Sequence, residues 1–212
     1  KLYKENLLNK NMLFVYQKQE NQYCYIEVVF EPRHFHHLTG TNITISTVKF
    51  FEMCIDNDLH MNDFELASDG TTRLKMGVIC ELMEIHRVAR TVGDSDFKLF
   101  TDKLIGNVRG CLGFVEEEGN AYLVPNTMLE YDIRRLIDEN NRLMAVYIKR
   151  IGEKYYNHLA YLVKGLNPDT LKWTKEIDNK IDKENLIIDF KVLTPSTQEG
   201  KPKQRKKKKI KK

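Results

Sequence analysis

The chain lacks the features that mark membrane and secreted proteins. No apolar run approaches the roughly 20 residues of a membrane-spanning helix, and the N-terminal residues have no signal-peptide core. The four cysteines are widely spaced and form no CxxC pair, and Cys24, Cys54 and Cys80 fall on apolar positions typical of reduced core cysteines. The first residue is Lys1 instead of Met, which indicates a processed or trimmed N-terminus. These absences favour an intracellular protein without a membrane partner.

Motifs for cofactors are also missing. The sequence contains neither GxGxxG nor GxxxxGK[ST], so no nucleotide cofactor is expected, and no GxSxG nucleophile elbow is present. His34 and His36 form an HxH pair of the kind that binds zinc, but no second ligand cluster lies at a recognisable spacing. The sequence therefore predicts no cofactor and no metal site.

Positive charge is scarce in the body of the chain and concentrated at its end. Residues 201–212 hold 9 of the 34 Lys and Arg residues and no acid, which leaves 25 bases against 30 acids, a net charge of −5, in residues 1–200. Such a basic run cannot form a packed core, so residues 196–212 are predicted to be disordered. The run is expected either to attract phosphate backbones or to serve only as a solubilising terminus.

The hydrophobic patterning predicts an α+β fold with a mostly antiparallel sheet. A domain is expected over residues 1–165, followed by a helical extension over 166–195. Strands are predicted at 12–17, 22–30, 97–101, 108–115, 121–124, 143–149 and 159–163. Helices are predicted at 46–55, 60–67, 72–89, 126–137 and from Asn167 through Trp173.

Three of the six histidines lie within four residues, directly after the strand predicted over 22–30. His34, His36 and His37 precede a loop at Thr39 and Gly40. Histidine exchanges protons near neutral pH, so a strand that delivers several histidines into a loop is typical of an active-site edge. If the strand continues, His34 and His36 share one face.

Four separated blocks resemble one known family in the same order. They are VVFEPRHFHHLTG, FELASDGTTRLK, KLIGNVRGCLGFV and VPNTMLEYDIRR. Together they resemble the Barnase/EndoU/colicin/RelE-like nuclease domains carried by phages and other mobile elements of Firmicutes, over roughly residues 5–165. The resemblance implies helices packed against an antiparallel sheet and a metal-independent ribonuclease or tRNase in the cytoplasm of a bacterial host cell.

Such chemistry requires a base for the 2′-hydroxyl proton, an acid for the leaving oxygen, and cations that stabilise the phosphorane. His37 matches the histidine of the family's HLTG block and is predicted as general base or acid. His34 or His36 is the candidate second proton carrier. Arg109 is the candidate phosphate clamp, because Arg holds phosphate bidentately. The alternative for each histidine is a structural role at the strand edge.

The remaining candidates are expected to bind substrate or to have ordinary structural roles. Lys103 and Asn107 are candidate transition-state donors, although a solvated Lys and a turn Asn are common. The other predicted binding residues are Thr39, Asn126, Thr127, Lys75 and Arg134. Asn126 or Thr127 is predicted to cap a helix, and Lys75 and Arg134 lie on predicted amphipathic helices, where surface charges are common.

Two functions of different classes follow from these patterns. The first is metal-independent cleavage of RNA, with tRNA as a candidate substrate and an immunity protein as a candidate partner. The alternative is a non-catalytic, nuclease-like module that binds a host protein or nucleic acid, favoured by the acidic body and by the incomplete catalytic set. A third option, another transferase or hydrolase reaction in the same cleft, predicts modification without strand scission.

Overall fold

A computed structural model describes residues 1–20, 22–95 and 100–189. The strands are β1 (Lys10–Gln19), β2 (Gln22–Phe30), β3 (Thr41–Ile43), β4 (Phe64–Leu66), β5 (Thr91–Asp94), β6 (Lys103–Gly106), β7 (Cys111–Val115), β8 (Val124–Leu129), β9 (Asn141–Arg150), β10 (His158–Leu162) and β11 (Ile187–Ile188). The α-helices are α1 (Leu2–Asn6), α2 (Phe35–Thr39), α3 (Thr47–Asp56), α4 (Thr71–Leu82), α5 (Ile85–Val88) and α6 (Lys175–Asp178). Short 3-10 helices are η1 (Pro32–His34), η3 (Ile133–Arg135) and η4 (Pro168–Thr170).

One large sheet forms the body of the protein. Its order is β11-β10-β9-β5-β6-β7-β8, and the β1–β2 hairpin is added on the other edge of β9. The named strands pair antiparallel, except for β11 with β10. A parallel bridge between Val28 and Leu123 joins β2 to the segment before β8, so the sheet curls back on itself. This curling brings the end of β2 next to the β7–β8 loop.

Strand β1 is buried on both faces because a hydrophobic layer covers each one. Met12 and Phe14 face the main core, which also includes residues of β2, α4 and β5–β9. Leu13 and Val15 face a second cluster that contains Trp173. Successive side chains of a strand point to opposite faces, so an unbroken apolar run at this position serves both layers.

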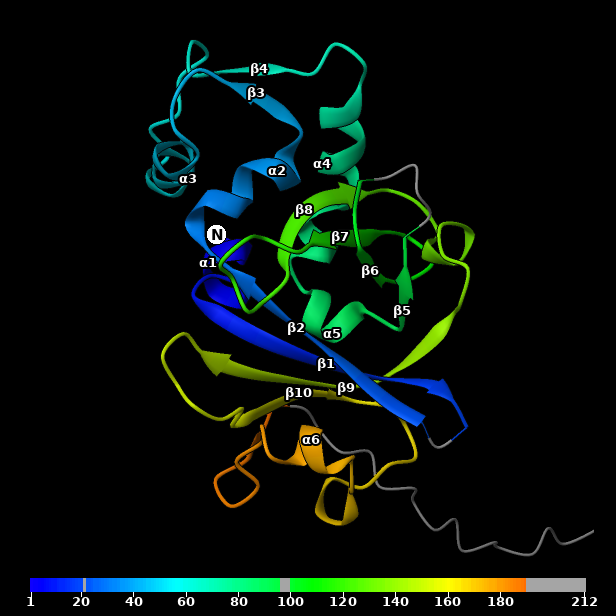
Figure 1. Cartoon of the computed structure of the whole chain (residues 1–212). Coiled ribbons are helices and arrows are strands. Elements are labelled where there is room, and N and C mark those ends of the chain that lie inside the picture. Colours follow the sequence, from blue (N-terminus) through cyan, green and yellow to red (C-terminus); the bar gives the residue numbers. More distant parts are fainter. Residues whose placement is uncertain (21, 96–99, 190–212) are drawn as a thin grey trace, which may run out of the picture.

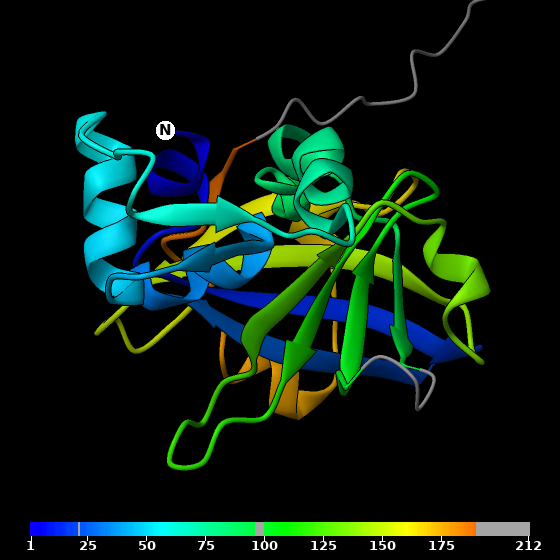
Figure 2. The same cartoon turned by 90° about the horizontal axis from the view of Figure 1, so that it is seen from above.

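Helices cover one side of the sheet. In Figure 1, α2, α3, α4 and the β3–β4 pair lie above the large sheet, and Figure 2 shows α3 and α4 on either side of the β3–β4 pair. Helix α3 lies where a helix is predicted over 46–55, and Ser46 caps it by accepting a hydrogen bond from the backbone N–H of Lys49. None of the helices formed by the described residues is long and apolar enough to cross a membrane.

The C-terminal segment packs on the outer face of β1, β9 and β10, where α6 lies below the sheet in Figure 1. The helix predicted from Asn167 through Trp173 is wrong. Pro168–Thr170 forms a single 3-10 turn, and Trp173 precedes α6. Trp173 is held instead by packing and by its indole N–H, which donates to the Tyr147 hydroxyl at 2.8 Å. The tail predicted over 196–212 lies outside the described residues.

Several other local predictions also fail. Residues 64–66 form β4 instead of part of a helix over 60–67, and residues 124–129 form β8 instead of opening a helix over 126–137. The helix predicted over 72–89 is interrupted, because α4 ends at Leu82 and α5 begins at Ile85. Within α4, Lys75 lies on the buried face and Leu74 is exposed. Of the cysteines, Cys111 is the buried one, and Cys80 is exposed. Most of the strand predicted at 97–101 lies outside the described residues.

Candidate active site

A cleft of about 360 Å³ lies where the segment after β2 faces the β7–β8 loop. This His37 cleft is lined by Arg33, His34, His37, Thr47, Val115, Glu116, Glu117, Val124, Pro125 and Asn126. Three separated parts of the chain therefore meet there, because α2 packs against β8 and the sheet curls. Two of the three clustered histidines line the cleft together with a guanidinium.

The histidines lie on helical turns, which corrects the predicted strand geometry. Strand β2 ends at Phe30, and Pro32 opens η1, which leads directly into α2. Proline lacks a backbone N–H and fixes φ, so it favours the first turn of a helix over a continuing strand. His34 and His37 are three residues apart on helical backbone, a spacing that places both on one side.

His37 is exposed to solvent at the cleft. Partial burial, the neighbouring His36 ring and the Lys75 ammonium all lower the pKa of His37 below its ordinary value of 6.5. The imidazole is therefore neutral at pH 7. A neutral, accessible imidazole is the form of histidine that accepts a proton.

The side chain of Lys75 holds the backbone of His37 through a hydrogen bond. Its side chain is buried, at 9% exposure, and its Nζ donates to the His37 carbonyl at 2.6 Å. Gly40 ends α2 with φ +67°, and a Cβ there would lie 2.9 Å from Lys75 Cδ. Burial lowers the pKa of Lys75. Lys75 is therefore not a surface charge, and it does not line the cleft as a predicted binding residue would; its ammonium group contacts the His37 backbone instead.

Replacing Lys75 by methionine is expected to raise the pKa of His37, because a cation that disfavours the imidazolium is removed. An NMR titration of the His37 ring measures this pKa. Lys49→Met, which removes an exposed lysine of α3, is the matched control and should leave the titration unchanged. An unchanged pKa in Lys75→Met would contradict the assigned role of the ammonium.

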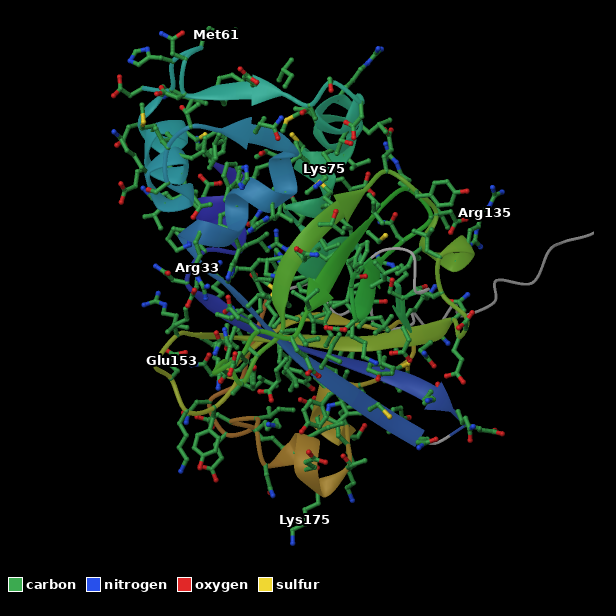
Figure 3. The ribbon with its side chains drawn as sticks, turned by 45° about the horizontal axis from the view of Figure 1, so that its top comes forward. Arg33, Met61, Lys75, Arg135, Glu153 and Lys175 are labelled. Carbon is green, nitrogen blue, oxygen red and sulfur yellow. The ribbon has the colours of Figure 1, made fainter. Side chains whose placement is uncertain are left out.

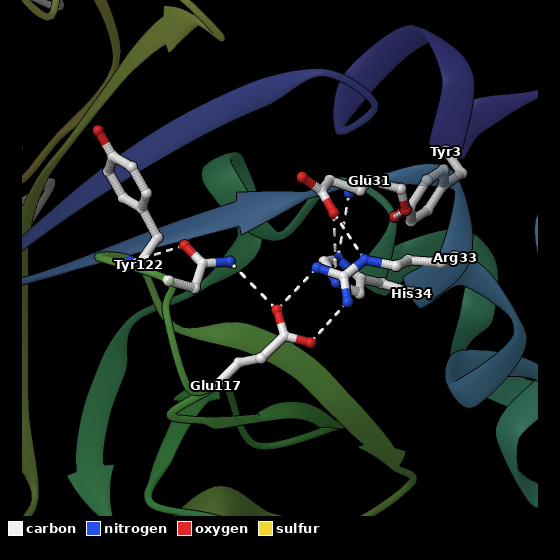
Figure 4. Close-up of polar contacts among 7 residues, drawn as sticks. Tyr3, Glu31, Arg33, His34, Glu117 and Tyr122 are labelled. Atoms are coloured by element: carbon white, nitrogen blue, oxygen red, sulfur yellow. Dashed lines mark hydrogen bonds and ion pairs between the residues drawn. The ribbon is translucent and has the colours of Figure 1, made fainter.

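Arg33 forms the strongest electrostatic contact of the cleft (Figure 4). Its Nη1 and Nη2 donate to the two carboxylate oxygens of Glu117 at 2.6 and 2.7 Å, and its Nε donates to Glu31 Oε2 at 2.7 Å. Hydrogen bonding to Arg33, and then to Asn120, lowers the pKa of Glu117 to about 2. The same carboxylates raise the pKa of Arg33. A planar guanidinium held in a fork geometry is the arrangement that also binds phosphate.

His34 is buried and holds the turn that carries Arg33. Its Nδ1 accepts the backbone N–H of Glu31 at 3.1 Å, so the proton of the neutral ring lies on Nε2. Nε2 is inaccessible and has no hydrogen-bond partner among the described residues. Burial, with the Arg33 charge, lowers the pKa of His34 to about 4. This geometry does not fit the predicted proton carrier and fits a positioning residue.

His36 contacts β3 and α3, and Thr39 contacts the backbone of α2. His36 Nε2 lies 2.7 Å from the carbonyl oxygen of Thr41, to which it donates, and the His36 ring packs edge-on against Phe50. Thr39 is buried, and its hydroxyl donates to the His36 carbonyl at 2.7 Å. Neither side chain lines the His37 cleft, so the structure does not bring these predicted binding residues to it.

Asn126 lines the cleft from β8, and Lys103 lies beside it. Asn126 Nδ2 donates to the Phe100 carbonyl at 3.2 Å. Lys103 forms an ion pair with Asp94 and lines an adjoining groove that shares Glu116 with the cleft. Thr127 is on β8 opposite Gly113, so neither it nor Asn126 caps a helix.

The predicted phosphate clamp is at the other end of the sheet. Arg109 precedes β7, whereas Val115 at the far end of β7 lines the cleft, and a strand of five residues spans roughly 13 Å. Arg109 pairs with Glu81, and the Asn107 side chain holds the turn by accepting the Arg109 and Gly110 backbone N–H groups. Arg134 is exposed on η3 and bound to Asp132. Figure 3 shows Arg33 and Arg135, the neighbour of Arg134, on opposite sides of the molecule.

The sequence predicts Arg33 only as part of a cluster with Lys103 and Arg109 that focuses the electrostatic field in a cleft. It does not indicate Glu31 or Glu117 as site residues. Arg33 directly precedes the first of the clustered histidines, which is a usable signal. Glu117 belongs to an acidic run before a turn, and its pairing with Arg33 depends on an approach across 84 residues that no local pattern reveals. Among the described residues, no group of three or more His, Cys, Asp or Glu side chains is arranged to hold a metal ion.

The curled antiparallel sheet flanked by helices is an α+β fold, and its cleft is lined by histidine and arginine side chains. The family model described as phage-Barnase-EndoU-ColicinE5/D-RelE like nuclease4 matches residues 1–165. The chain therefore belongs to this nuclease family, which confirms the predicted resemblance and the predicted fold class. Searches of curated proteins and of solved structures gave no match.

Proposed function

We propose that this member of the nuclease family cleaves RNA, with tRNA as a candidate substrate, by metal-independent transesterification in the His37 cleft. The observation that carries the proposal is the placement of a neutral, exposed His37 in one cleft with the bidentate guanidinium of Arg33. The cleft thus supplies a base and a phosphate-binding cation for this reaction, and solvent water supplies the proton for the leaving oxygen.

In the proposed reaction, His37 takes the proton of a ribose 2′-hydroxyl and the 2′-oxygen attacks the adjacent phosphorus. The bond from phosphorus to the 5′-oxygen breaks, and that oxygen takes a proton from solvent water. Arg33 stabilises the charge that develops on the phosphoryl oxygens, and Asn126 offers an amide at the cleft wall. The products are a 2′,3′-cyclic phosphate and a free 5′-hydroxyl.

The test is to incubate the purified protein with total tRNA and rRNA in EDTA and to map the ends of any fragments. We expect cleavage that is unaffected by EDTA and leaves 2′,3′-cyclic phosphate ends. Cleavage that requires a divalent cation, or that leaves 3′-hydroxyl ends, would overturn the proposed chemistry. Binding of RNA without turnover would favour the alternative of a non-catalytic module.

The Arg33–Glu117 ion pair is expected to compete with RNA phosphate for the guanidinium of Arg33. Glu117 occupies the guanidinium edge that the substrate phosphate requires, so Glu117→Gln is expected to tighten binding of an uncleavable RNA about 5-fold, or about 1 kcal/mol. Glu118→Gln removes the same charge from the neighbouring exposed position and is the matched control. Filter binding at fixed ionic strength measures both affinities. If both variants bind RNA equally more tightly, the gain in affinity comes from the change in net charge and not from the loss of the Arg33–Glu117 ion pair.

A further inference from the structure

Phe100 is placed unusually for a large aromatic residue. Its side chain is 89% exposed, although it lies close to a groove of the sheet. Its backbone has φ +49°, the left-handed region that is strained for residues other than glycine. Neither feature contributes to the stability of the fold, because the ring buries little apolar surface and the backbone conformation costs free energy.

A direct contact ties Phe100 to the His37 cleft. The carbonyl of Phe100 accepts the hydrogen bond from Asn126 Nδ2, and Asn126 itself lines the cleft. The backbone of Phe100 is therefore linked to a residue of the candidate active site, and Phe100 lines the groove next to that site.

The groove at Phe100 shares one wall residue with the His37 cleft. This Phe100 groove, of about 630 Å³, is lined by Asp94, Ser95, Phe100, Thr101, Asp102, Lys103 and Glu116. Glu116 lines both depressions. The Phe100 groove therefore adjoins the cleft that contains Arg33.

The charges of the groove select bases over phosphates. Asp94, Asp102 and Glu116 are acidic, and the cation Lys103 is already paired with Asp94. Among the described residues, the Glu116 carboxylate has no hydrogen-bond or ion-pair partner. Carboxylates repel phosphate but accept hydrogen bonds from the amino groups of a base edge.

From these observations we propose that Phe100 is a stacking platform for an unpaired nucleobase of the RNA substrate, next to the scissile phosphate. An exposed aromatic face stacks any base, and such stacking is a common way to bind single-stranded RNA. This assignment deepens the proposed ribonuclease function and rests on it for the identity of the ligand. It adds a substrate-binding subsite outside the His37 cleft.

The test measures binding separately from cleavage. The probes are short 2′-O-methyl oligoribonucleotides that carry 2-aminopurine, whose fluorescence is quenched by stacking and which lack the nucleophilic 2′-hydroxyl. Wild-type protein is compared with Phe100→Ala, with Phe100→Tyr, which keeps an aromatic face, and with Phe100→Gly, which relieves the left-handed backbone. Thermal unfolding of each variant verifies folding, and Phe100→Gly is expected not to lower the Tm.

We expect Phe100→Ala and Phe100→Gly to weaken binding about 10-fold and to lose the quenching, and Phe100→Tyr to keep both. Affinity that is unchanged in Phe100→Ala, or wild-type protein that does not bind the probes, would overturn the subsite. Unchanged probe binding is also the result expected if Phe100 contacts a protein partner instead.

If the wild type cleaves tRNA but Phe100→Ala binds and cleaves equally well, the subsite fails and the ribonuclease function stands. If binding depends on Phe100 and no RNA is cleaved, the ribonuclease function fails and the nucleobase site stands.

Discussion

His37→Ala is expected to lower the rate of RNA cleavage about 10³-fold while the protein stays folded. General base catalysis by a positioned side chain contributes rate factors of this order, and His37 is the exposed imidazole of the cleft. The fold should tolerate the change, because Lys75 contacts the His37 backbone carbonyl and not its ring. The measurement is the cleavage rate of tRNA in EDTA, with thermal unfolding as the check of folding.

His60→Ala is the matched control for this experiment. His60 is a histidine with 72% of its side chain exposed, and it is paired with Asp58 away from the cleft. It should retain the wild-type rate. A His37→Ala protein that cleaves as fast as His60→Ala would remove His37 from the mechanism and with it the proposed base.

Acidification is expected to destabilise the protein between pH 6.5 and pH 4 because of two buried histidines. His34 and His86 are each buried, and burial lowers the pKa of each to about 4 from the ordinary value of 6.5. A histidine whose folded-state pKa is depressed is held neutral, so its contribution is complete above pH 6.5 and is lost as the pH falls toward 4. Each histidine is expected to contribute about 3 kcal/mol to this loss.

Urea unfolding at pH 7.5 and at pH 4.5 measures the effect. The double variant His34→Gln and His86→Gln should start less stable at pH 7.5 and lose far less stability on acidification. A wild-type free energy of unfolding that is flat over this interval would contradict the prediction. The Glu117 carboxylate acts in a lower range, because its depressed pKa means that its contribution is lost only as the pH falls from about 4.5 toward 2.

The acidic body and the Arg33–Glu117 pair have related consequences for RNA binding. Residues 1–200 carry a net charge of −5 by sequence, and the strongest cation of the cleft is held by two carboxylates. Substrate phosphate must therefore displace a bound carboxylate. The protein is expected to bind RNA weakly unless this pair opens, which is the reason that Glu117→Gln should tighten binding.

Local sequence patterns predicted correctly those helices and strands that depend on residues close together in the sequence. The β1–β2 hairpin, α3 and the strands β9 and β10 follow from apolar runs rich in aromatic and β-branched residues, from helical spacing and from turn residues. The order of the four blocks also predicted the nuclease family and the α+β class. These features depend on neighbours within a few residues, which a sequence displays directly.

Where local propensity and tertiary packing disagreed, the sequence predicted the wrong element. Asn126 and Thr127 resemble a helix cap, yet β8 pairs with β7 there, because the sheet offers backbone partners that an isolated turn lacks. Lys75 resembles a surface charge, yet it is buried because the His37 carbonyl accepts its ammonium hydrogen bond. In both cases, the deciding contact comes from a residue distant in sequence.

The sequence by itself determined the fold class, the family and the presence of a histidine cluster after β2. Tertiary structure alone decided which histidine faces the cleft, and it placed Arg33 there while Arg109 lies at the other end of the sheet. The physical reason is the curling of the sheet, which joins the end of β2 to the β7–β8 loop through Val28 and Leu123 and so brings Glu117 to Arg33. These contacts join residues that are about a hundred positions apart, so no local or periodic pattern in the sequence indicates them.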